Sequence, residues 1–220
     1  MNRTGRTDGV SVFDDWLPPE DLFRLGRWLR SCRYAGVGPD GGRGPEGTLD
    51  ELAGPLAAGG IKFLRRPFVV AQEGGRLSGG RTAYPSGTPL DEVLDRVRAC
   101  AAGLGPEFGD PVSAWRRLGA GPKHYPRGHG MDWHDDARFV GTFALYCHDE
   151  WETSWGGELE LGREGGTRVE PLPNRCVFLR SGTRHRVIPV AEAAGARLRM
   201  SVIGYASRKR SGVGADGVAA

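Results

Sequence analysis

The sequence predicts a mainly β fold of the α+β class, an antiparallel sandwich or barrel covered by N-terminal helices. Two helical patterns occupy the first 110 residues, and short apolar segments separated by tight turns follow from about residue 112. No helical pattern lies between these segments, which favours antiparallel pairing of neighbouring strands. The length of 220 residues suits one domain with a substantial core.

The N-terminal half holds the two expected helices and one long irregular segment. A proline and two acids open the first helix within residues 17–32, "LPPEDLFRLGRWLRSC". The second follows Pro89 and has apolar residues on one face as far as Leu104. Residues 33–60 between them are rich in glycine and proline, so we expect a long loop that is either a substrate lid or an insertion without function.

The C-terminal half reads as a series of strands. The strand patterns are "SAWRRLGAG", "VGTFALYC", "GELELG", "TRVE", "RCVFLR", "HRVIPV" and "RLRMSVIGY", with turns such as "SWGG", "REGG", "PLPN" and "SGT" between them. We therefore expect disordered tails at 1–9 and 208–220 and a single domain at 10–207. In that domain, residues 10–110 would support the β-rich core at 111–207.

Composition excludes several classes of partner. The net charge of +3 comes from scattered residues, which does not favour nucleic-acid binding. No apolar run approaches the ~18 residues of a membrane span, and the first ten residues lack the apolar stretch of a signal peptide. Four widely spaced cysteines without a CxxC pair predict buried thiols in a reducing cytosol. We expect a cytoplasmic protein without nucleic-acid or membrane partners.

A candidate metal site lies in "GMDWHDDARFVGTFALYC", residues 130–147. His134 and Asp136 share one face of an extended segment, while Asp135 points to the other. His185 begins the apolar strand "HRVIPV" directly after a turn, where it could face the mouth of a barrel. Two histidines and one carboxylate form the facial triad of non-heme Fe(II) oxygenases.

The other three histidines are weaker candidates. His129 and His148 read as solvated loop residues, and His124 is a reserve ligand just before a strand.

A cosubstrate that is a 2-oxo acid would need a fixed cation for its far carboxylate. The guanidinium fork of arginine suits a carboxylate. The segment "RLRMSVIGY" supplies Arg197 and Arg199 on one face of the expected last strand.

These motifs together resemble the Fe(II)- and 2-oxoglutarate-dependent oxygenases, specifically the prolyl-hydroxylase-like branch. The resemblance rests on "WHDD", "WGGELEL", "PNRCVFLRSGTRHRVIPV" and "RLRMSVIGY", and covers about residues 110–206. It implies a double-stranded β-helix, the jelly-roll or cupin-like barrel. By the resemblance, the family's iron ligands fall on His134, Asp136 and His185.

The resemblance also implies a 2-oxoglutarate site and a reaction. The family's R-x-S arginine falls on Arg199 rather than Arg197, a tyrosine that often bonds the same carboxylate falls on Tyr146, and Tyr125 matches a position bordering the cosubstrate. The implied cofactors are Fe(II), 2-oxoglutarate and O2, and the implied reaction is C–H hydroxylation with release of succinate and CO2. Desaturation and ring closure are the other outcomes that the resemblance leaves open. Asp136 argues against halogenation, in which a small residue replaces the carboxylate.

The substrate is left open by the sequence. The approach "GHGMDWHDD" does not match prolyl hydroxylases closely enough to imply proline as the substrate. We favour a small molecule, such as an amino acid or a natural-product intermediate. The alternatives are a hydroxylase of peptide or protein side chains and a non-catalytic, metal-binding cupin-like module.

Overall fold

The computed structural model describes residues 2–7, 9–72, 77, 80–104, 108 and 115–208. Its N-terminal elements are β1 (Asn2–Thr7), β2 (Val10–Asp14), α1 (Pro19–Ser31), β3 (Tyr34–Val37), β4 (Arg43–Gly47), α2 (Ala53–Ala57), β5 (Phe63–Arg65), β6 (Val69–Gln72), β7 (Thr82–Ala83) and α3 (Leu90–Leu104). The remaining elements are β8 (Arg117–His124), β9 (Met131–His134), β10 (Gly141–Tyr146), η2 (Thr153–Trp155), β11 (Leu159–Leu161), β12 (Arg168–Val169), β13 (Cys176–Arg180), β14 (His185–Val187), η3 (Glu192–Ala194) and β15 (Ser201–Ser207).

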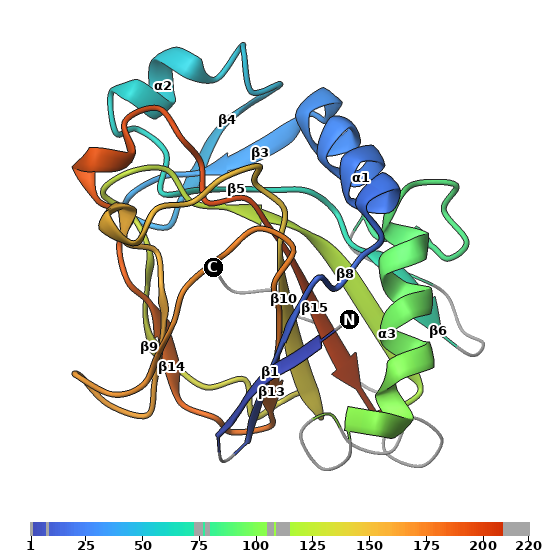
Figure 1. Cartoon of the computed structure of the whole chain (residues 1–220). Coiled ribbons are helices and arrows are strands. Elements are labelled where there is room, and N and C mark those ends of the chain that lie inside the picture. Colours follow the sequence, from blue (N-terminus) through green and yellow to red (C-terminus); the bar gives the residue numbers. More distant parts are fainter. Residues whose placement is uncertain are drawn as a thin grey trace.

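Two sheets form the double-stranded β-helix that was expected. The large sheet runs β1-β2-β13-β10-β15-β8-β5-β3-β4, with β6 and β7 joined at β8, and the small sheet runs β12-β11-β14-β9. In Figure 1 the small sheet, marked by β9 and β14, stands apart from β10 and β15 of the large one. Helices α1 and α3 cover the outer side of the large sheet, so the expected mainly β fold with N-terminal helices is confirmed.

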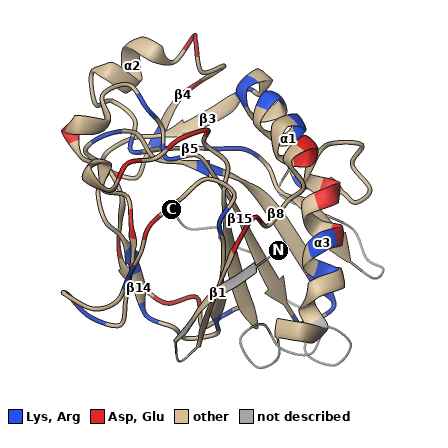
Figure 2. Cartoon of the chain, in the orientation of Figure 1, with Lys and Arg blue, Asp and Glu red and all other residues tan. Residues whose placement is uncertain are grey.

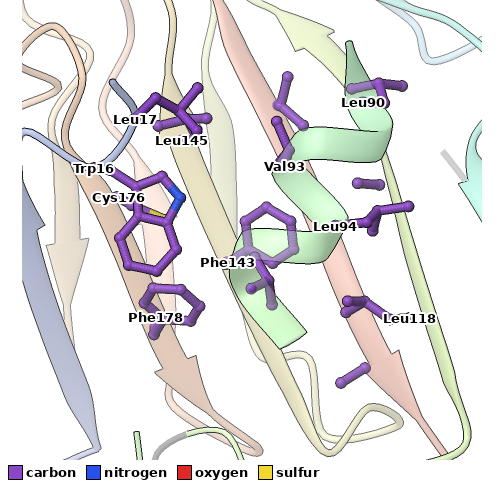
Figure 3. Close-up of a cluster of buried hydrophobic side chains, with 14 of the residues drawn as sticks. Trp16, Leu17, Leu90, Val93, Leu94, Leu118, Phe143, Leu145, Cys176 and Phe178 are labelled. Atoms are coloured by element: carbon purple, nitrogen blue, oxygen red, sulfur yellow. The ribbon is translucent and has the colours of Figure 1, made fainter. Parts of the chain in front are cut away.

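The central strands of the large sheet are apolar on both faces because both faces are covered. In β10, Phe143 and Leu145 belong to the cluster beneath α1 and α3, while Ala144 and Tyr146 belong to the cluster inside the barrel. Figure 3 shows the outer cluster, with Phe143 lying against α3. Both faces of β10 are therefore shielded from water. Its inner face also borders the site, so charged groups lie beside a buried strand.

Charged residues lie along the outward sides of the two helices (Figure 2), and one ion pair joins them. Arg24 of α1 contacts Asp21 on its own helix and Glu92 of α3, the latter at 3.0 Å. Arg24 and Glu92 are exposed and Asp21 is partly exposed, and such surface pairs contribute about 0–1 kcal/mol. The helices are therefore held mainly by their buried faces.

The prediction of a disordered tail at residues 1–9 is wrong for its central part. Residues 2–7 form β1, which pairs antiparallel with β2 at the edge of the large sheet. Polar composition did not reveal this strand, because an edge strand can be held by main-chain hydrogen bonds to its neighbour without an apolar face. At the other end, residues 209–220 of the expected tail lie outside the described residues.

The segment 33–60 is not the loop that its composition suggested. It contains β3, β4 and α2, and β3 pairs with both β4 and β5. A side chain at Gly36 would place its Cβ 2.7 Å from the carbonyl oxygen of Pro45, so glycine permits the close approach of the two strands. The glycines read as loop signals are here part of a hairpin.

Among the described residues, no helix has the length and apolar character needed to cross a membrane. The four cysteines are free thiols, as predicted, and three of them are buried.

Candidate active site

Three predicted metal ligands meet at the mouth of the barrel, between the two sheets. His134 ends β9 and His185 begins β14, and the two residues are direct partners in the antiparallel pairing of these strands. Asp136 follows two residues after β9. One potential ligand atom from each side chain lies within 4.8 Å of the others, and His185 Nε2 is 3.9 Å from Asp136 Oδ2.

Backbone carbonyls orient both imidazole rings. Nδ1 of His134 is 2.8 Å from the oxygen of Asp132, and Nδ1 of His185 is 2.8 Å from that of Thr183. A carbonyl can only accept, so each Nδ1 carries the proton and each Nε2 keeps its lone pair free. Burial, with repulsion from His134, lowers the pKa of His185, which keeps this ring in the neutral form that binds metals.

Arg199 lies deep in the barrel with one nitrogen unpaired. Its side chain is 1% exposed, Nε donates to the carbonyl oxygen of Gly157 at 2.6 Å, and Nη2 donates to the hydroxyl of Tyr146 at 3.2 Å. Nη1 is buried and has no hydrogen-bond partner among the residues that the structure describes. A buried guanidinium nitrogen without a partner is costly, and a carboxylate entering the cavity would satisfy it.

The two tyrosines named from the sequence flank this guanidinium. Its Cζ lies 4.8 Å from the ring centroid of Tyr146 and 5.6 Å from that of Tyr125. Tyr125 and Arg199 also exchange backbone hydrogen bonds across the sheet. Burial raises the pKa of Tyr146, so its hydroxyl stays neutral.

Arg197 does not share a face with Arg199, contrary to the expectation from strand alternation. The last strand, β15, begins only at Ser201, and a turn at residues 195–196 places Arg197 outside any strand. The Arg197 side chain is half exposed, with Nε 3.1 Å from Glu150 and its guanidinium over Trp155. It therefore lies outside the barrel.

The structure also corrects the reading of two other histidines. His148 is buried rather than solvated, with Nε2 against the carbonyl of Pro171 and its ring beside Trp151. His124 lies within β8, faces away from the cavity and is fully buried, so it is not a reserve ligand. His129 lies half-buried in a loop and is not part of the cluster.

The cavity that joins these groups has a volume of about 460 Å³, including the solvent at its mouth. His134, Asp136, His185 and Arg199 all line it. The apolar part of its wall comes from both sheets: Ala144, Leu159, Leu179, Val187 and Ile203. Metal-capable groups and a buried cation thus share one largely apolar chamber, an arrangement suited to binding a ligand that bridges them.

A family model described as the 2OG-Fe(II) oxygenase superfamily matches residues 120–207, the part of the chain that carries all of these groups. This part of the chain is thus similar to the 2OG-Fe(II) oxygenase superfamily. The match indicates an oxidoreductase of the hydroxylase type, and the superfamily uses Fe(II), 2-oxoglutarate and O2. No curated protein matches the chain at a significant level.

Solved structures of prolyl-hydroxylase-like oxygenases share this fold. A prolyl-4-hydroxylase from Pseudomonas putida is 18% identical, with a TM-score of 0.56 over 92% of this chain and 94% of that one. An oxidoreductase of the 2OG-Fe(II) oxygenase family from Burkholderia pseudomallei is 14% identical, with a TM-score of 0.57 over 92% and 87%. A viral collagen prolyl hydroxylase from Paramecium Bursaria Chlorella virus-1, solved as its 2OG complex, is 12% identical, with a TM-score of 0.54 over 94% and 100%.

Sequence reasoning missed the roles of two residues at this site. Gly157 was read as part of a turn and of the motif "WGGELEL", yet its carbonyl holds Arg199. Lys123 lines the cavity from β8, and its one sequence signal is its position two residues before Tyr125, on the same face of the strand.

Gly157→Ala should weaken 2-oxoglutarate binding. Gly157 has a φ of +76°, and a Cβ there would lie 2.9 Å from Cδ of Arg199, so the guanidinium must shift. Gly162→Ala is a matched control, because its φ is +78° and nothing lies within 4 Å of the added Cβ. Both variants should lose about 1 kcal/mol of stability from backbone strain. Equal 2-oxoglutarate affinities in a calorimetric titration of the two variants would contradict the role given to Gly157.

Acid should destabilise the protein partly through His124. Its Nδ1 accepts from the backbone N–H of Ser201 and its Nε2 donates to the hydroxyl of Tyr34, which in turn bonds the carbonyl of Leu29. Burial lowers the pKa of His124 to about 3, far below the value of about 6.5 in an unfolded chain. As pH falls from about 6.5 towards 3, His124 is protonated in the unfolded state but stays neutral in the native state. The free energy of unfolding therefore decreases in that pH window.

Urea unfolding between pH 6 and pH 5 measures this effect. One such histidine contributes a slope of up to about 1.4 kcal/mol per pH unit. His124→Gln should be less stable overall but should show a shallower decline with acid. Parallel curves for wild type and variant would mean that His124 is not the group responsible.

Proposed function

We propose that this oxygenase hydroxylates an unactivated C–H bond of a small molecule, such as an amino acid or a natural-product intermediate, with release of succinate and CO2. His134, Asp136 and His185 would hold Fe(II), Arg199 and Tyr146 the distal carboxylate of 2-oxoglutarate, and Tyr125 would border it. One observation carries the proposal: the three converging ligand atoms and the unpaired Nη1 of Arg199 line one cavity.

Fe(II), when bound, would supply the oxidising chemistry with O2 and 2-oxoglutarate. The protein's own groups prepare the site. The carbonyls behind His134 and His185 hold each Nε2 towards the centre, and the carboxylate of Asp136 adds a negative charge there.

The rest of the chamber orients the organic ligand and excludes water. Arg199 can offer Nη1 to a carboxylate without moving, because Gly157 and Tyr146 already hold its other nitrogens. The apolar wall keeps bulk water from the reacting centre.

The surface around the chamber favours a small substrate over a peptide. Peptide-binding surfaces usually expose apolar anchoring points. Among the described residues the one large hydrophobic side chain that is exposed is Phe23, which lies on α1.

Oxygen and 2-oxoglutarate consumption by the purified chain tests this function. With Fe(II), the protein should convert 2-oxoglutarate to succinate slowly by itself, and faster when a library of small molecules contains the substrate. Absence of succinate formation under all conditions would favour a non-catalytic cupin-like module. Stimulation by peptides and not by small molecules would favour the peptide hydroxylase.

A further inference from the structure

The cavity contains a second cation, Lys123, whose role the proposed iron and 2-oxoglutarate sites do not explain. Lys123 lies near the end of β8 and points into the barrel with Tyr125, while His124 between them points out. Its ammonium lies 3.7 Å from Sδ of Met131 on β9 and 4.6 Å from the ring centroid of Phe63 on β5. It thus faces the cavity on the side where β5 and β9 approach β8.

This ammonium has no anionic partner in the described part of the chain. None of the carboxylates there lies within 4 Å of Nζ, and the ammonium contacts a thioether and two aromatic faces. Burial lowers the pKa of Lys123 to about 8; attraction from Asp136 opposes this, and Arg65, Arg199 and Lys62 repel the charge further. A partly buried amine among other cations is a site that an anion would stabilise.

The anions expected from the cosubstrate already have other partners. The distal carboxylate of 2-oxoglutarate is assigned to Arg199, whose Nη1 is unpaired, and the 2-oxo acid end is assigned to the metal. Asp136, the carboxylate that attracts Lys123, is itself assigned to the metal. No negative charge of the cosubstrate therefore remains to pair with the ammonium of Lys123.

We propose that Lys123 binds a carboxylate of the primary substrate, which makes that substrate a small carboxylic acid. The inference rests on the proposed function and narrows its substrate class. The ammonium is a compact charge on a flexible stem, suited to a single carboxylate group. Phe63 and Met131 beside it provide apolar contacts for the carbon atoms next to that group.

Three lysines in the chain, Lys62, Lys123 and Lys209, make the test direct. The full chain is saturated with Mn(II) and 2-oxoglutarate without oxygen, and small carboxylic acids, including amino and hydroxy acids, are added beside their neutral carboxamides. The lysine amines are then acetylated chemically, and the extent of acetylation at each lysine is measured by peptide mass spectrometry. Binding of each compound and of 2-oxoglutarate is measured by calorimetry, in wild type, Lys123→Met and the control Lys62→Met.

At least one acid should protect Lys123 from acetylation, and its carboxamide should not. Lys123→Met should weaken binding of that acid at least about tenfold, as expected for loss of a charge-assisted hydrogen bond, and should leave 2-oxoglutarate affinity nearly unchanged. Lys62→Met should weaken binding of the acid far less than Lys123→Met and should leave 2-oxoglutarate affinity nearly unchanged.

Two results would overturn the inference. Protection by no acid at millimolar concentration would show that the cavity has no second carboxylate site. A loss of 2-oxoglutarate affinity in Lys123→Met as large as in an Arg199 variant would assign Lys123 to the cosubstrate. Failure of wild type to bind Mn(II) and 2-oxoglutarate at all would instead reject the proposed function, so the two failures are distinguishable.

Discussion

Replacing His185 with alanine is expected to abolish turnover and to lower Fe(II) affinity by more than about 100-fold, because even changes to residues behind a metal ligand commonly cost 10–100-fold. His185 is 5% exposed, and its Nε2 faces Asp136 and the ring of His134 at the cavity wall. Two of the three expected protein ligands would remain, too few to hold the ion in a fixed geometry. Asp136→Ala and His134→Ala should behave alike.

The fold should survive this change, which separates a ligand from a structural residue. The large apolar cluster beneath α1 and α3 does not include His185. Circular dichroism should therefore match wild type, and Mn(II) titration should show the lost affinity directly. His129→Ala removes a histidine outside the cluster and should keep wild-type turnover. Near-normal turnover in His185→Ala would mean that another group completes the site.

Replacing Arg199 with lysine should raise the KM for 2-oxoglutarate by at least about tenfold, although the charge is kept. The guanidinium uses Nε for Gly157 and Nη2 for Tyr146, and Nη1 is the nitrogen that we propose for the cosubstrate. A lysine ammonium lacks the planar fork of donors of a guanidinium, so it cannot make all three hydrogen bonds in this geometry. The effect should appear mainly in KM for 2-oxoglutarate, because the metal ligands are unchanged.

Tyr146→Phe tests the same carboxylate site from its other side. Loss of a hydrogen bond that involves a charged group costs roughly 1.5–3 kcal/mol, which corresponds to more than a tenfold rise in the same KM. Arg197→Lys is the matched control, since that side chain lies at the surface beside Glu150. Unchanged 2-oxoglutarate saturation in Arg199→Lys would place the carboxylate on another cation, with Lys123 the first to examine.

Local sequence patterns were sufficient for the fold class and for most elements. Helical spacing predicted α1 and α3 because each buries one apolar face against the large sheet. Short apolar segments and tight turns predicted the strands of the core. The same reasoning failed at β1 and in residues 33–60, where pairing with a neighbouring strand outweighs a polar or glycine-rich composition.

The sequence by itself determined the fold class, the superfamily resemblance and the pair His134 and Asp136 on one face, since these depend on residues close together in the chain. Only the tertiary structure decided what meets across long separations. The pairing of β9 with β14 brings His185 opposite His134, and the late start of β15 puts Arg199 inside and Arg197 outside. That none of the described carboxylates pairs with Lys123 also depends on the tertiary structure, because several strands distant in the sequence surround this side chain.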